Sequence, residues 1–295
     1  MLFGSASFPP RATLADAVAA MNRVDPLDSW PRSWLESYER DRQEIYGEII
    51  HHGYTYAYHN RLKHTLEMVR KVAPPGSRIL DVAAAQGNFA LSLAEAGYEV
   101  TWNDIRGELT GYVKLKHSHG TIRYQPGNIF ELSAAQASYD LVLSNEIIEH
   151  VAHPDRFLQH VASLVRPGGF IVMTTPNGEY FRNKLPKFSN CSDPSAFESV
   201  QFKPDADGHI FLIHQDELYI FAEQSGLTLR ELRFFTTPLT TGHVKLERLL
   251  HVLPRACVDS LEAACQKLPN ILKRKLYLHI GAIFCKPDHG AREEG

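Results

Sequence analysis

Short apolar runs alternate with helix-like segments along residues 78–174, and this alternation restricts the possible folds more than any other feature. Each apolar run has the length of a strand, and each segment between runs is long enough for a short helix. The expected strands are 78–83, 98–103, 121–125, 139–144 and 170–174, and the expected helices are 87–96, 108–117 and a segment from Pro154 onward. Because strands that alternate with helices pair in parallel, we expect an α/β, doubly wound sheet with helices on both faces.

The sequence on either side of this stretch predicts further helices and two more strands. Before the break at Pro74-Pro75-Gly76, apolar residues recur at helical spacing in two stripes, Leu14, Val18 and Met21, and Leu62, Leu66 and Val69. After it, we expect a sixth strand at 227–235, two amphipathic helices within 244–272 and a last strand at 276–285. We therefore divide the chain into an N-terminal helical cap (1–75), an α/β core (76–243), a helical insert (244–275) and the last strand with a tail (276–295), which together give a seven-stranded, mostly parallel sheet.

The composition favours a soluble globular protein. Of the 295 residues, 44% are hydrophobic and 22% are charged, which is unlike a disordered chain. A net charge of −3 makes nucleic acid an unexpected partner. The four cysteines lie far apart and match no zinc spacing, so we expect reduced thiols. We also expect no signal peptide, no membrane span and a cytoplasmic location.

Three short segments follow expected strands, where ligands bind in a doubly wound sheet. The first runs from Asp81 to Gly87 and is rich in small residues, which let a ligand lie close to the backbone. The second is Asp104, whose carboxylate can accept hydrogen bonds from both hydroxyls of a ribose. The third is Gly127-Asn128-Ile129, where the amide of Asn128 can meet an adenine edge and Ile129 can pack on its face. A plainer alternative is that the two aspartates only cap loops.

These segments resemble the first motifs of class I S-adenosylmethionine-dependent methyltransferases. That family has D-x-G-x-G-x-G in the first motif, and its acidic residue follows the last glycine as Asp104 follows Gly87, by 17 residues. This chain departs from the pattern at Ala83 and Ala85, where a positive φ is costly for alanine. A dinucleotide dehydrogenase is the nearest rival, but the turn Gly87-Asn88-Phe89 lacks its G-x-x-G.

A second block extends the resemblance. Ser144–Val151, Pro154, Pro167-Gly168-Gly169 and Thr174–Asn177 are similar to the ubiquinone-biosynthesis O-methyltransferases and their relatives that act on small molecules and glycans, over about 61–232. The resemblance implies that Arg61 meets the carboxylate of S-adenosylmethionine, Ala83 its methionine part, Asp104 its ribose and Asn145 the region near sulfur. The expected cofactor site comprises Arg61, Asp81, Ala83, Gln86, Gly87, Asp104, Ile105, Asn128, Ile129 and Asn145. The resemblance also implies O-methylation of a phenolic, quinol-like or sugar hydroxyl.

Histidines and carboxylates after the fourth strand are candidates for catalysis. A base with a pKa near neutral suits a hydroxyl acceptor, so we expect His150 or His209 to take the proton. On a helix, Glu146, Glu149 and His150 share one face. With His209 they are expected to hold Mg²⁺ or another divalent cation, in a pattern similar to metal-dependent small-RNA 2′-O-methyltransferases. Alternatively, Glu149 and His150 only stabilise the start of the helix.

Other functions stay open at this point. One is a metal-dependent RNA 2′-O-methyltransferase, and another is a non-catalytic module that has lost tight cofactor binding through Ala83 and Ala85. The tyrosine-rich segment before residue 60 is expected to be either a lid over the acceptor or the core of the helical cap. We expect the helices of 244–272 to form a lid, with a homodimer contact or a membrane surface as alternatives.

Overall fold

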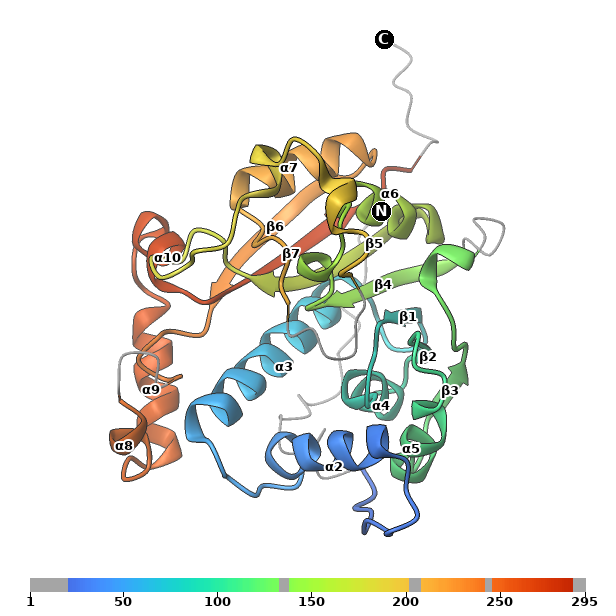
Figure 1. Ribbon diagram of the computed structural model, residues 1–295, viewed down its shortest axis with the longest axis vertical. Coiled ribbons are helices and arrows are strands. Elements are labelled where there is room, and N and C mark those ends of the chain that lie inside the picture. The colour runs from blue at the N-terminus through green and yellow to red at the C-terminus, as the bar shows by residue number, and fades with distance from the viewer. Residues whose placement is uncertain (1–20, 133–137, 202–207, 242–245, 289–295) are drawn as a thin grey trace, which may run out of the picture.

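The computed structural model describes residues 21–132, 138–201, 208–241 and 246–288. Seven strands form one sheet in the order β3-β2-β1-β4-β5-β7-β6 (Figure 1). Neighbouring strands from β3 to β5 are parallel, and β7 is antiparallel to both β5 and β6. The strands are β1 (Arg78–Val82), β2 (Glu99–Asn103), β3 (Thr121–Tyr124), β4 (Tyr139–Asn145), β5 (Val165–Pro176), β6 (Thr228–Phe235) and β7 (His279–Cys285). The predicted fold class is confirmed.

Helices cover both faces of the sheet because the strands are apolar on both sides. In β1, Ile79 packs into the core beneath α3, α4 and α5, while Leu80 packs into the core beneath α6 and α7. The period-two alternation of the strand therefore serves two separate cores. The helices are α3 (His52–Val72), α4 (Asn88–Glu95), α5 (Leu109–Lys116), α6 (Pro154–Leu164) and α7 (Gln215–Gln224).

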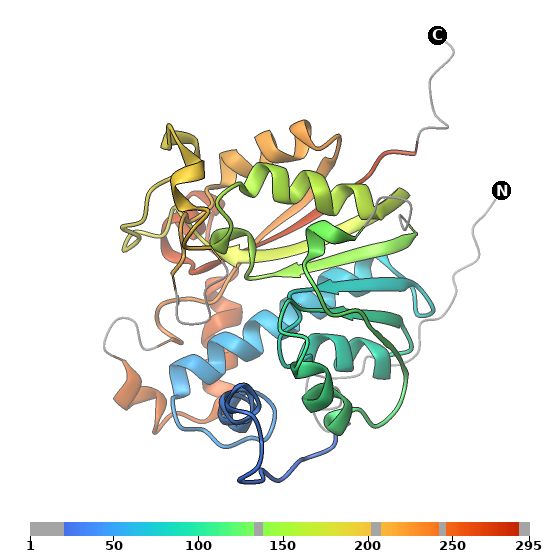
Figure 2. The same cartoon turned by 45° about the vertical axis from the view of Figure 1, so that its right-hand side comes forward.

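The segments outside the core are helical as expected, with one difference in number. The N-terminal segment contains α2 (Arg32–Glu44) and α3, and the stripe of Leu62, Leu66 and Val69 is buried. The insert contains three helices where two were expected: α8 (Glu247–Leu250), α9 (Arg255–Cys265) and α10 (Asn270–Leu276). Helices α8 and α9 lie beside α3 (Figures 1 and 2). The expected stripe at Leu14 and Val18 lies outside the described residues, and the domain boundaries stay a prediction.

Two strands begin several residues away from the expected position. Strand β5 begins at Val165 rather than at residue 170, because Val165 pairs with Tyr139 ahead of the Pro-Gly-Gly turn. Strand β7 begins at His279 rather than at 276, because α10 continues to Leu276. None of the described helices combines the length and apolar character needed to cross a bilayer.

Candidate functional site

A cavity of about 630 Å³ opens at the carboxyl ends of the parallel strands. Loops that follow β1, β2, β3 and β4 form one wall, and α2 and α3 form the other. All of the expected cofactor residues line it except Gly87, namely Arg61, Asp81, Ala83, Gln86, Asp104, Ile105, Asn128, Ile129 and Asn145. Gly87 lies behind the cavity, where it begins α4 with φ 77°, and an added Cβ would lie 2.7 Å from Val113.

The loop after β1 is held in a tight, left-handed conformation. Ala83 has φ 53° and Ala85 has φ 48°, so both alanines occupy the backbone region that favours glycine. The amide of Ala85 donates to Asp104 Oδ2 at 2.8 Å, and the carbonyl of Ala85 accepts from Trp102 Nε1 at 3.1 Å. Strand β2 therefore fixes the loop at two points, the ring of Trp102 near its end and the carboxylate of Asp104 just after it.

The Asp104 carboxylate is buried and already has four donors. Besides the amide of Ala85, it accepts from the backbone amide of Arg106 at 2.9 Å and from the guanidinium Nε at 3.1 Å and Nη2 at 3.3 Å. The side chain of Arg106 is 39% exposed, so it can move into solvent without leaving a core position. A ribose at Asp104 would take the place of these guanidinium contacts, while the backbone amides keep the carboxylate oriented.

Several buried polar atoms in the cavity wall have no hydrogen-bond partner among the described residues. They are Arg61 Nε, Asp81 Oδ2, Asn145 Nδ2 and Glu146 Oε1. Each unmade hydrogen bond of this kind costs roughly 1–3 kcal/mol, so a bound ligand with both donors and acceptors would be stabilised here. The amino-acid end of S-adenosylmethionine, with one carboxylate and one ammonium, matches that demand. The residues present therefore fit the cofactor.

The carboxyl groups in and near the cavity differ in the direction in which their pKa values are shifted. Burial, together with the nearby Asp104, raises the pKa of Asp81 to about 8. Burial also favours the neutral form of Glu146, but Arg61 and then His279 outweigh it and lower the pKa of that carboxyl. Burial and the charge of Glu146 raise the pKa of Glu149 well above its ordinary value. The surroundings therefore favour the ionised form of Glu146 and the neutral form of Glu149.

The predicted helical face of Glu146, Glu149 and His150 is wrong. Glu146 has φ 50°, which stops helix propagation, and only a short 3-10 helix follows at Ile148–His150. Glu146 instead forms an ion pair with Arg61 at 3.4 Å and lies 3.7 Å from His279. Its Oε2 therefore faces Arg61 and His279, and Glu146 is not among the residues whose ligand atoms lie within 4.8 Å of one another.

The remaining three predicted ligands do lie together. The ligand atoms of Glu149, His150 and His209 lie within 4.8 Å of one another, and the two imidazole centroids are 4.9 Å apart. Thr175 Oγ1 donates to Glu149 Oε2 at 2.9 Å. Of the three, only His150 lines the cavity. His150 is thus the member of the set that a substrate in the cavity can reach.

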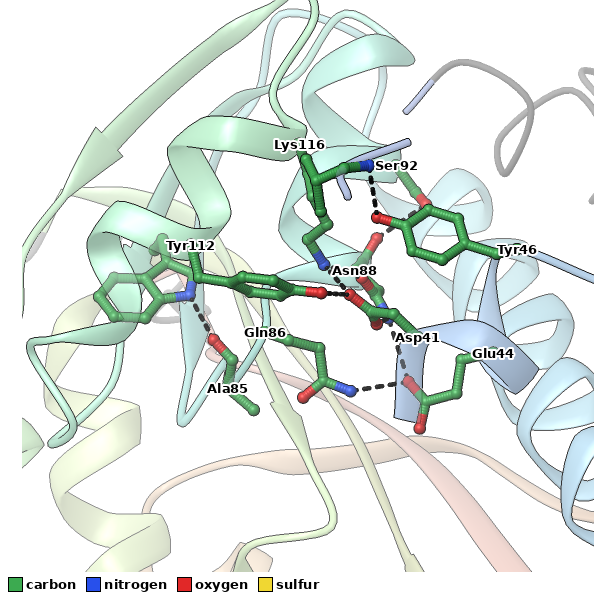
Figure 3. Close-up of polar contacts among 11 residues, drawn as sticks. Asp41, Glu44, Tyr46, Ala85, Gln86, Asn88, Ser92, Tyr112 and Lys116 are labelled. Atoms are coloured by element: carbon green, nitrogen blue, oxygen red, sulfur yellow. Dashed lines mark hydrogen bonds and ion pairs between the residues drawn. The ribbon is translucent and has the colours of Figure 1, made fainter. Parts of the chain in front are cut away.

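Helix α2 contributes residues that sequence reasoning missed. Arg40 and Glu44 line the cavity. Figure 3 shows that Gln86 points toward Glu44, to which its Nε2 donates at 2.7 Å, and that Asn88 Nδ2 donates to Glu44 Oε2 at 3.0 Å. Burial and then Asp41 raise the pKa of Glu44. Glu44 stands in a helix with many exposed charges, so the sequence alone did not mark it as part of the cavity wall.

The aromatic residues of the cap divide between the two expected roles. Tyr54 and Tyr58 line the cavity, as a lid over the ligand would. Four others pack on one another or on Tyr112 as a small core, namely Trp30, Trp34, Tyr38 and Tyr46, while Tyr56 packs against the insert. The insert does not form the expected lid within the described residues, because none of its described side chains lines the cavity. It packs on α3 instead.

Comparisons with known proteins agree with this fold. The Ubiquinone biosynthesis O-methyltransferase of Xanthomonas campestris pv. campestris (strain B100) is 32% identical over 145 residues, which cover 42% of this chain and 61% of that protein. The protein of the same name from Coxiella burnetii (strain Dugway 5J108-111) is 28% identical over 177 residues, which cover 55% of this chain and 68% of that protein.

Structural similarity extends beyond the part that sequence similarity covers. The structure of Haemonchus contortus Phosphoethanolamine N-methyltransferase 2 in complex with S-adenosyl-L-methionine has a TM-score of 0.50 and 16% identity, and the match covers 76% of this chain and 52% of that chain. A family model described as a methyltransferase domain matches residues 54–232, which is more than half of the chain. The chain therefore belongs to the methyltransferase domain family and has the fold of the S-adenosylmethionine-dependent methyltransferases.

Proposed function

We propose that this protein transfers a methyl group from S-adenosylmethionine to a hydroxyl oxygen of a small molecule, with a phenolic, quinol-like or sugar acceptor. The observation that carries the proposal is a single cavity that joins the β1 loop and Asp104 to His150. The names of the relatives support oxygen as the acceptor atom. A cytoplasmic location and a homodimer stay predictions.

In this proposal the polar wall binds the cofactor. Arg61 holds the carboxylate with the Nε that lacks a partner, and Asn145 Nδ2 lies toward the sulfur end. Asp104 accepts from the ribose hydroxyls after Arg106 moves aside. Asn128 and Ile129 meet the adenine, although Asn128 Oδ1 also accepts from the amide of Phe130 at 3.1 Å. The adenine edge therefore meets the amide nitrogen of Asn128.

The protein aligns the acceptor and accepts its proton. S-adenosylmethionine supplies a methyl carbon on a sulfonium, which leaves as a neutral thioether when the new oxygen–carbon bond forms. His150 takes the hydroxyl proton, with its ring placed at the cavity wall by the short 3-10 helix and beside the His209 ring. Tyr54 and Tyr58 cover the acceptor from α3 and exclude water. Alignment of this kind lowers the barrier by roughly 7–11 kcal/mol at best.

Calorimetry and turnover of two variants test the proposal. Asp104→Ala is expected to weaken S-adenosylmethionine binding strongly, while His150→Ala binds it as the wild type does and loses roughly 10²–10⁴ in turnover on catechol and quinol acceptors. Wild-type protein that binds no S-adenosylmethionine would support a non-catalytic module instead. A fully active His150→Ala variant would remove that residue as the base.

A metal-assisted reaction is the second candidate, because the ligand atoms of Glu149, His150 and His209 lie within 4.8 Å of one another. A divalent cation there would chelate vicinal hydroxyls and lower their pKa. Turnover lost after chelation and restored by Mg²⁺ or Zn²⁺ would support it, and turnover unchanged by chelation would exclude it. If the acceptor is RNA, binding should weaken steeply with salt, whereas a small acceptor shows no such dependence.

A further inference from the structure

We propose that His52, Glu247 and His251 form a second metal site, which takes a zinc-like divalent cation and fastens the helical insert to α3. The three residues lie outside the cavity described above. His52 is the first residue of α3, and Glu247 begins α8. Figures 1 and 2 show α8 and α9 beside the start of α3, so the site joins segments far apart in the sequence.

The ligand atoms are already arranged around one point. Glu247 Oε1 lies 4.0 Å from His52 Nδ1 and 3.8 Å from His251 Nε2, and all three atoms lie within 4.8 Å of one another. Glu247 and His251 are one helical turn apart, so their side chains share a side. Bonds of about 2 Å to a tetrahedral ion need ligands about 3.4 Å apart, so side-chain rotations that close each gap by roughly 1 Å complete the site.

Helix capping explains why the carboxylate of Glu247 lies at the start of α3, but it does not explain why two imidazoles lie beside it. Glu247 accepts from the amides of His52 at 2.8 Å and Gly53 at 3.2 Å, which satisfies the first turn of α3. The rings of His52 and His251 nonetheless lie with centroids only 4.0 Å apart. His52 Nδ1 is buried and has no hydrogen-bond partner among the described residues. A cation bonded to both rings accounts for this arrangement.

The donor atoms of the three side chains suit a zinc-like ion. Two imidazole nitrogens and one carboxylate oxygen are donors that Zn²⁺ prefers, whereas Mg²⁺ and Ca²⁺ prefer oxygen donors. Half of the His251 side chain is exposed, which leaves a path for the ion and room for a water as the fourth ligand.

The apolar core between α3 and the insert is small, so a metal ion there would add much to the stability of this contact. Among the described residues, the apolar cluster between α3, α8 and α9 consists of three buried side chains, Tyr56, Leu250 and Val258, with Leu253 packed against them. Arg255 lies 4.8 Å over the ring of Tyr56 and donates to His59 Nδ1 at 2.9 Å. Because α3 also carries Tyr54, Tyr58 and Arg61 into the cavity, the ion would steady one wall of the site.

Metal titration of the full chain tests the proposal. After chelator treatment, Zn²⁺ is expected to raise the melting temperature and Co²⁺ to give the visible absorption of a tetrahedral site. His251→Ala, at an exposed position that tolerates truncation, is expected to weaken Zn²⁺ binding at least about tenfold and to abolish the Co²⁺ spectrum. Glu247→Gln keeps one of the two capping oxygens but removes the charge, so it is expected to weaken metal binding while lowering the metal-free melting temperature only slightly.

Two controls decide where the ion binds. His51→Ala changes an exposed histidine next to the site and is expected to bind Zn²⁺ as the wild type does. The double variant His150→Ala/His209→Ala removes the other cluster and is expected to keep the Co²⁺ spectrum of the new site. Wild-type protein that binds no Zn²⁺, equal binding by His251→Ala, or loss of binding only in the double variant would each overturn the proposal.

Discussion

Ala83 and Ala85 concentrate strain at the floor of the cavity. A left-handed backbone costs a residue with a Cβ roughly 1–2 kcal/mol, and both alanines adopt one. The hydrogen bond from the amide of Ala85 to Asp104 keeps the second of them in place. Alanine in place of glycine therefore raises the energy of this loop. The backbone path stays the same, so a ligand can still approach it closely.

Glycine at either position is expected to stabilise the protein. Ala83→Gly and Ala85→Gly should each raise the free energy of unfolding by about 0.5–1 kcal/mol, because relief of strain exceeds the added entropy of the unfolded chain. Denaturant unfolding measures the change. Ala84→Gly is the matched control, since Ala84 lies between them without a positive φ and its change should be destabilising. Equal destabilisation by all three variants would show that the backbone of Ala83 and Ala85 is not strained.

Asp81 gives the stability a defined pH dependence. Burial and the adjacent Asp104 raise its pKa to about 8 in the folded state, whereas the unfolded chain ionises near 3.8. The folded protein therefore holds an extra proton between these values, and the stabilisation is complete at low pH and is lost as the pH rises through about 8. Asp81→Asn should remove up to about 1.4 kcal/mol per pH unit from this slope, as measured by unfolding across the interval. Identical slopes would mean that Asp81 is ionised in the folded protein.

The identity of the loop residues could be predicted, but not their backbone. The spacing of Asp81, Gly87 and Asp104 is visible in the sequence because the strand ends set it. The resemblance places Ala83 and Ala85 at glycine positions of the family, but the two residues themselves do not indicate a positive φ, because alanine ordinarily avoids it. The left-handed backbone of Glu146 could not be predicted either, and it breaks the helix that the spacing between Glu146 and His150 had suggested.

Helix α2 is fixed to the core by a buried polar network. Asp41 accepts from Lys116 Nζ at 2.6 Å, from Tyr112 Oη at 2.7 Å and from Asn88 Nδ2 at 2.7 Å (Figure 3). Asp41 and Lys116 are both fully buried. Through Asn88 the network continues to Glu44 in the cavity wall. The position of that wall thus depends on contacts between α2, α4 and α5.

Removal of one partner is expected to cost far more than loss of a surface ion pair. Lys116→Met leaves the Asp41 carboxylate buried without its cation, so the free energy of unfolding should fall by about 3–5 kcal/mol. Arg32→Ala, which removes an exposed pair with Glu36, is the control and should cost about 0.5 kcal/mol or less. Addition of Asp41→Asn to Lys116→Met should recover part of the loss. Equal effects of Lys116→Met and Arg32→Ala in denaturant unfolding would contradict the network's role.

The sequence could not reveal this network. Asp41 and Lys116 are 75 residues apart, and each stands in an amphipathic helix where a charged residue ordinarily faces water. Helix periodicity predicted α3 well because its apolar stripe is long. It could not predict which polar side chains turn inward, because burial of a polar group depends on partners from other elements.

For the molecule as a whole, the alternation of strands and helices was sufficient to predict the sheet. Parallel strands that are buried on both faces leave near-continuous apolar runs, which a doubly wound sheet with helices on both faces satisfies. The two faces form large cores beneath α3–α5 and α6–α7. Helix α8 and the first part of α9, by contrast, meet α3 through a cluster of only three buried apolar residues, Tyr56, Leu250 and Val258, whereas Cys265 at the end of α9 packs against a large core. The packing of the insert on α3 rather than over the cavity was not predictable, because its apolar stripes do not specify the surface they meet.

This difference in core size predicts that the insert opens independently of the sheet. Val258→Ala removes buried methyl groups from the smallest cluster, so amides of α8 and α9 should exchange hydrogen faster, while β4, β5 and β7 keep wild-type protection. Val142→Ala, in a strand of the large core, should instead raise exchange across the sheet, because that core opens only with the whole fold. Hydrogen exchange by mass spectrometry resolves the two cases. Faster exchange of the sheet in Val258→Ala would show that the insert and the sheet unfold as one cooperative unit, so the insert's small contact area would not limit its stability.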